Sequence, residues 1–309
     1  GIMTDNLFQR KYEFALAEAE KIVLEKAHIL ASSVKTDETK GRPVVLFNNL
    51  SFDRSVPASF DIQLTQGEAK QLKITDAKGN GVPAQLSHVK YYDDQSIEKA
   101  TVHFVATEVP AMGLKTYYLN ESDDMAEILQ PANQTIENKF YRIELGKGGI
   151  QQIFDKELNT PLLNTDKFMG GEIITMHSYG NGAGEFDAVQ QPDMEGFDKT
   201  SLHAKGWELV ENGPVFTSYK MRTPVRHAIV EQTLRIYHQT KRIDMDVDLL
   251  NWEGVMFRDF RLMLPLALGK AEVSYEVPYG SLTVGKDEMP GTAGERYYVE
   301  NKLQHPRGI

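Results

Sequence analysis

The sequence predicts a mainly β protein, with a small β-sandwich followed by a large antiparallel sandwich and one amphipathic helix at the N-terminus. Three observations support this fold class. Apolar residues recur every three or four positions near the N-terminus, which is the period of a helix. From about residue 42 the period changes to two, which is typical of strands with one buried face. Gly, Pro, Asp and Asn residues separate the short segments, as turns do between strands.

The helix is expected over residues 4–34, without an interrupting Gly or Pro. An isolated amphipathic helix cannot bury its apolar face, so we expect it to pack on the β-region after it or to belong to a bundle whose other helices are missing. The start Gly1-Ile2-Met3, with its internal-looking Met, fits the second alternative. Residues 1–41 are therefore predicted as a helical segment and linker. The apolar stripe consists of Phe8, Tyr12, Ala15, Ala19, Val23, Ala27, Leu30 and Val34.

Residues 42–120 are predicted to form the small β-sandwich. A buried strand is expected over residues 44–48, and further strands over residues 70–74, 100–105 and 114–119. An acidic stretch with little patterning comes next, and residues 121–135 are predicted as a second linker.

Residues 136–309 are predicted to form the large sandwich, because their strands are longer and numerous. Residues 242–250 give the clearest pattern, with Ile243, Met245, Val247 and Leu249 on a core face and three aspartates on the wet face. Segment 170–206 is Gly-rich and polar, and is predicted to be a long functional or mobile loop. The other strands are expected over residues 139–145, 150–154, 215–222, 229–237, 258–264 and 271–277.

Composition excludes several classes of partner. A net charge of −10 has the wrong sign for binding nucleic acid, so none is expected. No apolar run approaches the roughly 18 residues of a membrane-spanning helix, so no membrane partner is expected. The chain has no cysteine, which removes thiolate nucleophiles and zinc–thiolate sites but leaves the cellular compartment open.

The Gly-rich segment carries the side chains that could perform sugar chemistry. Glycosidases use two carboxyl groups about 5 Å or 6.5–9.5 Å apart, and this segment can display such a pair. Its acids are Glu185, Asp187, Asp193 and Glu195. The more ordinary interpretation is that they are solvated loop acids. His177, followed by Ser178 and Tyr179 at the mouth of the segment, is the histidine of most interest, although an ordinary polar loop histidine fits as well.

Other patterns could also carry chemistry. Asp244, Asp246 and Asp248 share a strand face and could line a cation or sugar site, but a solubilising sheet face is the simpler interpretation. The eight histidines show no metal-ligand spacing. The glycines at 146, 148 and 149 indicate a hairpin turn rather than a phosphate-binding loop. Aromatic side chains that could stack on a sugar ring, or simply pack in a core, are Trp207, Trp252, Tyr179, Phe186 and Phe197.

Five segments in order, spread over most of residues 42–309, together resemble one protein family. The segment Val45-Leu46-Phe47-Asn48-Asn49-Leu50-Ser51-Phe52-Asp53-Arg54 resembles the strand that opens the family's β-region. The start of its large sandwich is similar to Ile136-Glu137-Asn138-Lys139-Phe140-Tyr141-Arg142-Ile143, with Gly149-Ile150 and Ile153-Phe154-Asp155-Lys156. Later matches are Arg242-Ile243-Asp244, Arg261-Leu262-Met263-Leu264-Pro265-Leu266 and Tyr275-Glu276-Val277-Pro278-Tyr279-Gly280. The family that these segments resemble is the glycoside hydrolase family 38 α-mannosidases.

The resemblance implies that the helix is the tail of a missing helical domain and that residues 136–309 are part of a mutarotase-like supersandwich. It implies a parent enzyme that removes α-linked mannose with retention, with zinc and the catalytic carboxylates in a missing catalytic domain. No catalytic residue and no metal ligand is therefore assigned to this chain. The chain would scaffold the active site and contact an α-mannoside glycan beside the rest of the enzyme. The expected substrate-binding residues are His177, Tyr179, Glu185 and Asp187.

One local departure and two alternatives accompany this interpretation. The loop form found in many family members is replaced here by Asn181-Gly182-Ala183-Gly184-Glu185-Phe186. A stand-alone carbohydrate-binding module would use exposed aromatic residues to bind sugar by itself. A mutarotase-like or lyase-like sugar enzyme would instead need a histidine and a carboxylate, such as His177 and Glu185, that converge on a concave face.

Overall fold

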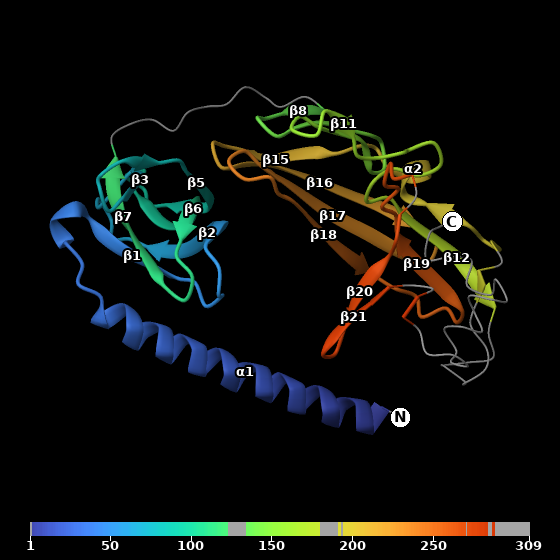
Figure 1. Cartoon of the computed structure of the whole chain (residues 1–309), viewed down its shortest axis with the longest axis horizontal. Helices are drawn as coiled ribbons and strands as arrows, with labels where there is room; N and C mark the ends of the chain where they lie inside the picture. The colour runs from blue at the N-terminus through green and yellow to red at the C-terminus, as the bar shows by residue number, and fades with distance from the viewer. Residues whose placement is uncertain are drawn as a thin grey trace. The chain divides into compact units, whose positions relative to one another are not determined.

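The computed structural model describes residues 2–122, 134–179, 191–192, 194–269, 271–283 and 286–287. The chain divides into two compact units, one of Gly1–Ile128 with Gly213–Val215, the other of Leu129–Asn212 with Phe216–Ile309. Antiparallel sheets make up most of the ordered structure, which confirms the mainly β prediction (Figure 1). The domain boundaries expected at residues 41, 120 and 135 stay a prediction.

The N-terminal helix α1 (Ile2–Ser33) forms where the apolar period predicts it. Every residue from Met3 to Leu30 is exposed, including Tyr12, which is 74% exposed. One of the two alternatives was that this helix packs on the β-region after it. Among the described residues, that packing is therefore not found.

The rest of the first unit is a small β-sandwich. After a short 3-10 turn, η1 (Glu38–Lys40), come two antiparallel sheets in the orders β1-β7-β3-β4 and β2-β6-β5. Their strands are β1 (Arg42–Phe47), β2 (Arg54–Gln63), β3 (Gln71–Asp76), β4 (Gly81–Val82), β5 (Ala84–Tyr91), β6 (Ile97–Val109) and β7 (Leu114–Ser122). The sequence did not suggest β2 or β5. Pro57 obscures β2, because proline is tolerated only at the edge of a sheet, and β2 is an edge strand.

Aromatic side chains fill the core between these two sheets. Phe104 of β6 is completely buried, and its ring lies edge-on to Tyr117 of β7 at a centroid distance of 5.0 Å and to Phe60 of β2 at 6.3 Å. Edge-to-face contacts of this kind stabilise a core beyond the area that they bury. Phe104 therefore joins the two sheets of this unit.

The described residues of the second unit form four sheets and a short helix (Figure 1). The sheets have the orders β11-β10-β9-β8, β13-β12-β14 with β19 also paired to β12, β15-β16-β17-β18, and β20-β21. The elements are β8 (Thr135–Glu137), β9 (Tyr141–Leu145), β10 (Ile150–Asp155), β11 (Thr160–Pro161), β12 (Ile173–Tyr179), β13 (Gln191–Pro192), β14 (Asp198–Lys199), α2 (Thr200–His203), β15 (Glu208–Asn212), β16 (Phe216–Val225), β17 (Ala228–Tyr237), β18 (Ile243–Leu250), β19 (Arg258–Leu262), β20 (Ser274–Val277) and β21 (Gly280–Thr283).

The glycines after β9 form the turn that the sequence predicts. β9 and β10 are antiparallel, and the Gly146 N–H donates to the Gly149 carbonyl at 2.8 Å. A Cβ on Gly148 would lie 2.3 Å from the Cα of Ser201, so the first residues of α2 pack directly on the turn. The hairpin interpretation is confirmed.

The prediction of one long loop over residues 170–206 is wrong for its described part. β12 begins at Ile173, and Ile173, Ile174 and Met176 are buried. β12 pairs with β14 on one side and with β19 on the other. Because both faces and both edges of this strand are covered, its apolar residues are continuous rather than alternating, and the surrounding glycines conceal it in the sequence.

The prediction for residues 242–250 is half correct. The strand β18 forms, and Asp246 and Asp248 lie exposed on one face as expected. On the other face Val247 is 38% exposed and Leu249 is 42% exposed, so their assignment to the core is wrong. The two side chains are exposed because β18 is the last strand of its sheet, and one of its edges lacks a described neighbour that would cover them.

An ion pair joins two hairpins of this unit and predicts a pH dependence. Lys241 Nζ lies 2.8 Å from Asp155 and 2.7 Å from Glu157. The hydrogen bond from Lys241, with backbone N–H donors of Leu158 and Glu157, lowers the pKa of Asp155. A lowered carboxyl pKa stabilises the fold above the unfolded pKa of about 3.9, and this stabilisation is lost as the pH falls through the folded pKa.

We therefore expect Asp155→Asn to lower the melting temperature at pH 7 by about 2–4 °C, with a smaller difference from wild type at pH 3. Thermal unfolding at both pH values measures this. Asp166→Asn, at an exposed carboxylate that carries no described ion pair, is the control. An equal loss at both pH values would contradict the role given to the ionised Asp155.

Candidate functional site

The end of β12 places His177, the histidine singled out from the sequence, beside two other segments. Its backbone N–H donates to the Glu195 carbonyl at 3.0 Å, and its ring lies edge-on to Phe257 at a centroid distance of 6.2 Å. The next residue, Ser178, donates its backbone N–H to the Phe257 carbonyl at 2.8 Å. The side chain of His177 is half-buried. β12 thus holds this imidazole between segment 194–196 and the start of β19.

Arg258 fixes the same three segments together. It stands opposite His177 in the β12–β19 register, and its Nε donates to the Thr175 hydroxyl at 3.0 Å. Its two terminal nitrogens donate to the carbonyls of Glu195, at 3.2 Å, and of Gly196. The planar guanidinium presents its donors as a rigid fork, so it holds segment 194–196 against β12 more firmly than a lysine could.

The strand β19 also places a carboxylate, that of Asp259, next to β12. Asp259 is opposite Met176 in the register, accepts from the Ser178 hydroxyl at 3.3 Å and lies 3.1 Å from Arg261. Successive residues of a strand point to opposite faces, so His177 and Arg258 lie on one face of the β12–β19 pair and Asp259 on the other. We call these three polar residues at one strand end the β12 cluster. The imidazole and the guanidinium, which share a face, can hydrogen-bond the hydroxyls of a sugar.

A second histidine–carboxylate pair lies at β14 and α2. His203 Nε2 is 2.6 Å from Asp198 Oδ1, and the backbone N–H of Arg226 donates to Asp198 Oδ2 at 2.7 Å. Asp198 also pairs with Thr175 in the β12–β14 register. This pair therefore borders the β12 cluster and braces the neighbouring strand.

The other residues proposed from the sequence fall in several places. Glu185, Asp187, Asp193 and Phe186 lie outside the described residues, and of Tyr179 only the backbone, paired with Gln191, is described. Glu195 is exposed and Phe197 half-buried. Trp207 is buried and donates its indole N–H to the Gly149 carbonyl at 3.3 Å, which is the core role considered for it. Trp252 is 41% exposed, with its ring edge-on to Phe260 at 5.2 Å.

Arg258 and Asp259 were not singled out from the sequence. Their segment was recognised only as a strand. The run Arg258-Asp259-Phe260-Arg261 places three charged residues on a strand of an acidic protein, which is a weak signal that they serve some purpose. Their pairing with β12 could not be derived, because Ser178 and Asp259 lie 81 positions apart in the chain.

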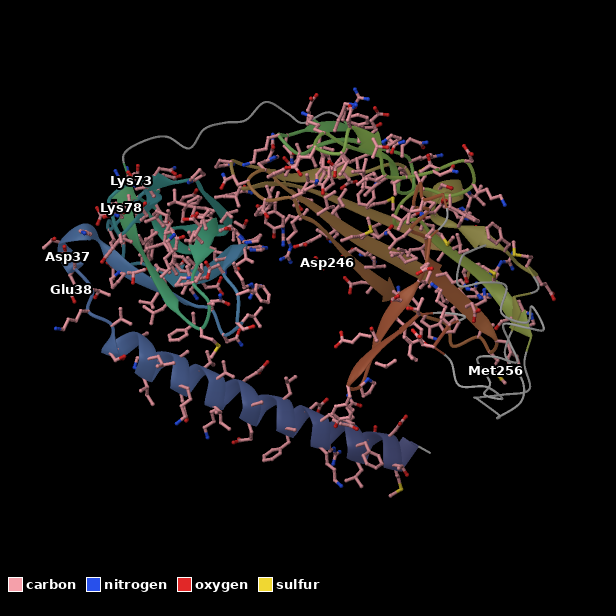
Figure 2. All side chains as sticks on the ribbon, in the orientation of Figure 1. Asp37, Glu38, Lys73, Lys78, Asp246 and Met256 are labelled. Atoms are coloured by element: carbon pink, nitrogen blue, oxygen red, sulfur yellow. The ribbon has the colours of Figure 1, made fainter. Side chains whose placement is uncertain are left out.

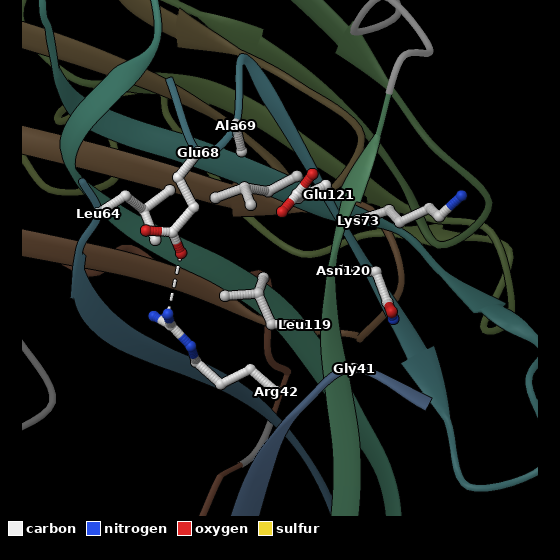
Figure 3. Close-up of a pocket in the computed structure, with 10 residues that line it drawn as sticks. Gly41, Arg42, Leu64, Glu68, Ala69, Lys73, Leu119, Asn120 and Glu121 are labelled. Carbon is white, nitrogen blue, oxygen red and sulfur yellow. Dashed lines mark hydrogen bonds and ion pairs between the residues drawn. The ribbon is translucent and has the colours of Figure 1, made fainter. Parts of the chain in front are cut away.

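A separate cavity of about 490 Å³ opens in the first unit (Figure 3). Its apolar lining includes Leu64, Leu72 and Leu119. Arg42 and Glu68 also line it, with Arg42 Nη2 3.0 Å from Glu68 Oε1. Hydrogen bonds from the backbone N–H and hydroxyl of Thr65, with the Arg42 charge, lower the pKa of Glu68. Arg42 and Glu68 thus neutralise each other, and Lys73 and Glu121 also line the cavity.

The described residues show neither a group of metal ligands nor a membrane-spanning helix. Among the described residues, no group of three or more histidine and acidic side chains is placed to hold a metal ion. The zinc ion that the family resemblance implies was expected in another domain of the enzyme, so that expectation stays a prediction. No helix in the described ranges is long and apolar enough to cross a bilayer.

Comparison with protein families identifies the second unit. The model of the glycosyl hydrolases family 38 C-terminal domain matches residues 136–299, which is more than half of the chain and includes β12, β19 and the whole β12 cluster. The chain belongs to glycosyl hydrolase family 38. The resemblance stated from sequence motifs is thereby confirmed. A search of curated proteins finds no match to the chain.

Family membership indicates the class of enzyme to which the domain with the β12 cluster belongs. The chain carries a domain of a glycoside hydrolase family, and the family match indicates an enzyme that acts on glycans.

Proposed function

We propose that this chain is the C-terminal β-region of a retaining α-mannosidase, in which it scaffolds the active site and contacts the α-mannoside. The observation that carries the proposal is the family 38 match over residues 136–299. Support comes from the β12 cluster, in which His177 and Arg258 stand opposite each other on one face of the β12–β19 pair.

The role proposed for the β12 cluster is binding and orientation of the sugar. Glycosidic hydrolysis with retention needs a nucleophilic carboxylate and an acid/base carboxyl about 5 Å apart. The carboxylate of the β12 cluster, Asp259, lies on the opposite face of the strand pair from His177 and is already paired with Arg261. We therefore assign bond cleavage to the catalytic domain of the enzyme and assign no catalytic residue here.

We also propose that the full-length enzyme binds a zinc ion outside this chain. When bound in the catalytic domain, the ion would act as a Lewis acid on sugar oxygens. The described residues of this chain offer it no ligand set. In this chain we propose that His177, Tyr179, Glu185 and Asp187 bind substrate, the last two lying outside the described residues.

Hydrolysis of an aryl α-mannoside tests the proposal. We expect the 309-residue chain alone to show no turnover, and the full-length enzyme that carries it to lose turnover when a chelator is added. Turnover by the isolated chain at a rate unaffected by chelator would overturn the proposal. Turnover by the full-length enzyme of β-mannosides but not of α-mannosides would overturn the substrate assignment.

Substitution of His177 tests its contact with the sugar. In the full-length enzyme, His177→Ala is expected to raise KM for the α-mannoside about 3- to 10-fold with a smaller change in kcat, because it removes one hydrogen-bonding group from the bound sugar. Steady-state kinetics measures both constants.

His28→Gln, on the exposed helix α1, is the matched control and should leave KM and kcat unchanged. An unchanged KM in His177→Ala would remove this residue from the binding site.

A second candidate function is a carbohydrate-binding module that acts by itself. The observation that favours it is Trp252, whose exposed ring is braced by Phe260 and could stack on a pyranose face. Calorimetric titration of the isolated chain with mannose oligomers distinguishes the two functions. A scaffold should give no heat of binding, whereas a module should saturate, and Trp252→Ala should then abolish the signal.

A further inference from the structure

The edge strand β18 offers an open sheet edge. In the order β15-β16-β17-β18 it pairs with β17 through eight residue pairs, and among the described residues no strand pairs with its other side (Figure 1). Such an edge presents a row of unpaired N–H and C=O groups, which is a template for another strand.

Both faces of β18 are also open over the same residues. The four consecutive residues Asp246, Val247, Asp248 and Leu249 are all exposed, although the two apolar ones point to the side that carries the buried Gln232 and Val230 of β17. Natural edge strands usually protect their apolar face. Here that face continues the core to the edge of the sheet and is left uncovered by the described residues.

On the opposite face, two of the carboxylates have no ion pair among the described residues. Asp244 is 2.6 Å from Arg242 and is therefore compensated. Asp248 stands opposite Glu231, a pairing of like charges, and Glu231 is already bound by Lys220 at 2.7 Å and Arg222 at 3.5 Å. Asp246 stands opposite Thr233 and is exposed on the same face (Figure 2). Within the described part of the chain, these two carboxylates thus lack a cation of their own.

We propose that the open edge of β18 takes up, as an added strand, an extended peptide segment in which basic and apolar residues alternate. Side chains of neighbouring strands that share a face lie about 5 Å apart. Lys or Arg of the incoming segment would neutralise Asp246 and Asp248, while its apolar residues would cover Val247 and Leu249. A second copy of β18 does not meet these needs, because it would bring two rows of aspartates together.

Fluorescence anisotropy with a labelled Lys-Val repeat peptide and the 309-residue chain tests the proposal. The alternating peptide is expected to bind, more weakly as salt rises. A Glu-Val repeat and a peptide with its lysines and valines in separate blocks are the controls. Equal binding of the block peptide would show attraction by charge without strand addition, and it would overturn the proposal. So would no binding of the alternating peptide.

Backbone hydrogen bonding is tested with N-methylated peptides. Methyl groups on alternate residues remove the donors along one edge of the added strand, and shifting them by one residue removes those of the other edge. One of the two peptides should lose binding and the other retain it. Equal affinity of the two would overturn the proposal.

The charged contacts are tested by the isosteric double variant Asp246→Asn/Asp248→Asn. It should weaken binding of the alternating peptide about 2- to 30-fold, from about 0.2–1 kcal/mol for each cross-strand pair. The double variant Asp93→Asn/Asp166→Asn makes the same change of net charge at exposed sites on other segments than β18 and should bind like wild type. Equal weakening in both variants, or a dimer of the chain that the peptide does not dissociate, would overturn the proposal.

Discussion

Glu172→Ala is expected to lower the free energy of unfolding of the second unit by about 3–5 kcal/mol, the cost of breaking a buried charged network. Glu172 is completely buried just before β12. Its carboxylate accepts from the Met169 N–H at 2.9 Å and the Ser201 N–H at 3.3 Å, and lies 3.4 Å from Lys199 Nζ. Removing it leaves two N–H groups and a cation without their acceptor.

Urea unfolding followed by tryptophan fluorescence measures this loss, because both tryptophans lie in the second unit. Glu172→Gln is the control. It keeps the shape and an acceptor oxygen but not the charge, so we expect a smaller loss of about 1–3 kcal/mol. Equal losses in the two variants, or a loss below about 1 kcal/mol in Glu172→Ala, would contradict a role for the charged network.

Phe104→Ala is expected to lower the free energy of unfolding of the first unit by about 3–5 kcal/mol. The substitution leaves a cavity in the middle of the small sandwich and removes both edge-to-face contacts, to Phe60 and Tyr117. Far-UV circular dichroism follows the unfolding of both units, whereas tryptophan fluorescence follows the second alone. The variant should therefore shift part of the dichroism signal and leave the fluorescence midpoint in place.

Phe104→Leu serves as the comparison, with an expected loss of about 1.5 kcal/mol because much of the volume is kept. Movement of the fluorescence midpoint together with the dichroism midpoint would show that the two units unfold as one, contrary to the expectation.

The sequence predicted what depends on local pattern. The alternation in residues 229–237 and 242–250 identified β17 and β18, and the glycines between β9 and β10 identified a turn. Prediction from the sequence failed where the burial of a strand depends on which other strands lie beside it. β12 is enclosed on both faces and reads like a loop with a few apolar residues, while Val247 and Leu249 have a core pattern at an edge that the described residues leave open.

The candidate site was predicted in part, for the same reason. His177 was chosen because it lies at the mouth of the Gly-rich segment, and the structure places it near the end of β12. Its contact with a sugar stays a prediction. Arg258 and Asp259 carry no local mark, since the register that sets them opposite His177 and Met176 is a property of the folded sheet. A single sequence contains the strands but not the order in which they pair.

The pairing of β12 with β19 has a consequence for synthesis of the protein. Ser178 and Asp259 are separated by 81 positions, so the β12 cluster can assemble only after the chain as far as Leu262 has left the ribosome. Contacts this distant in sequence slow folding, because a long loop must close before they form. Until then the apolar residues of β12 lack β19 as a neighbour, and nascent chains halted between the two strands would depend on chaperones.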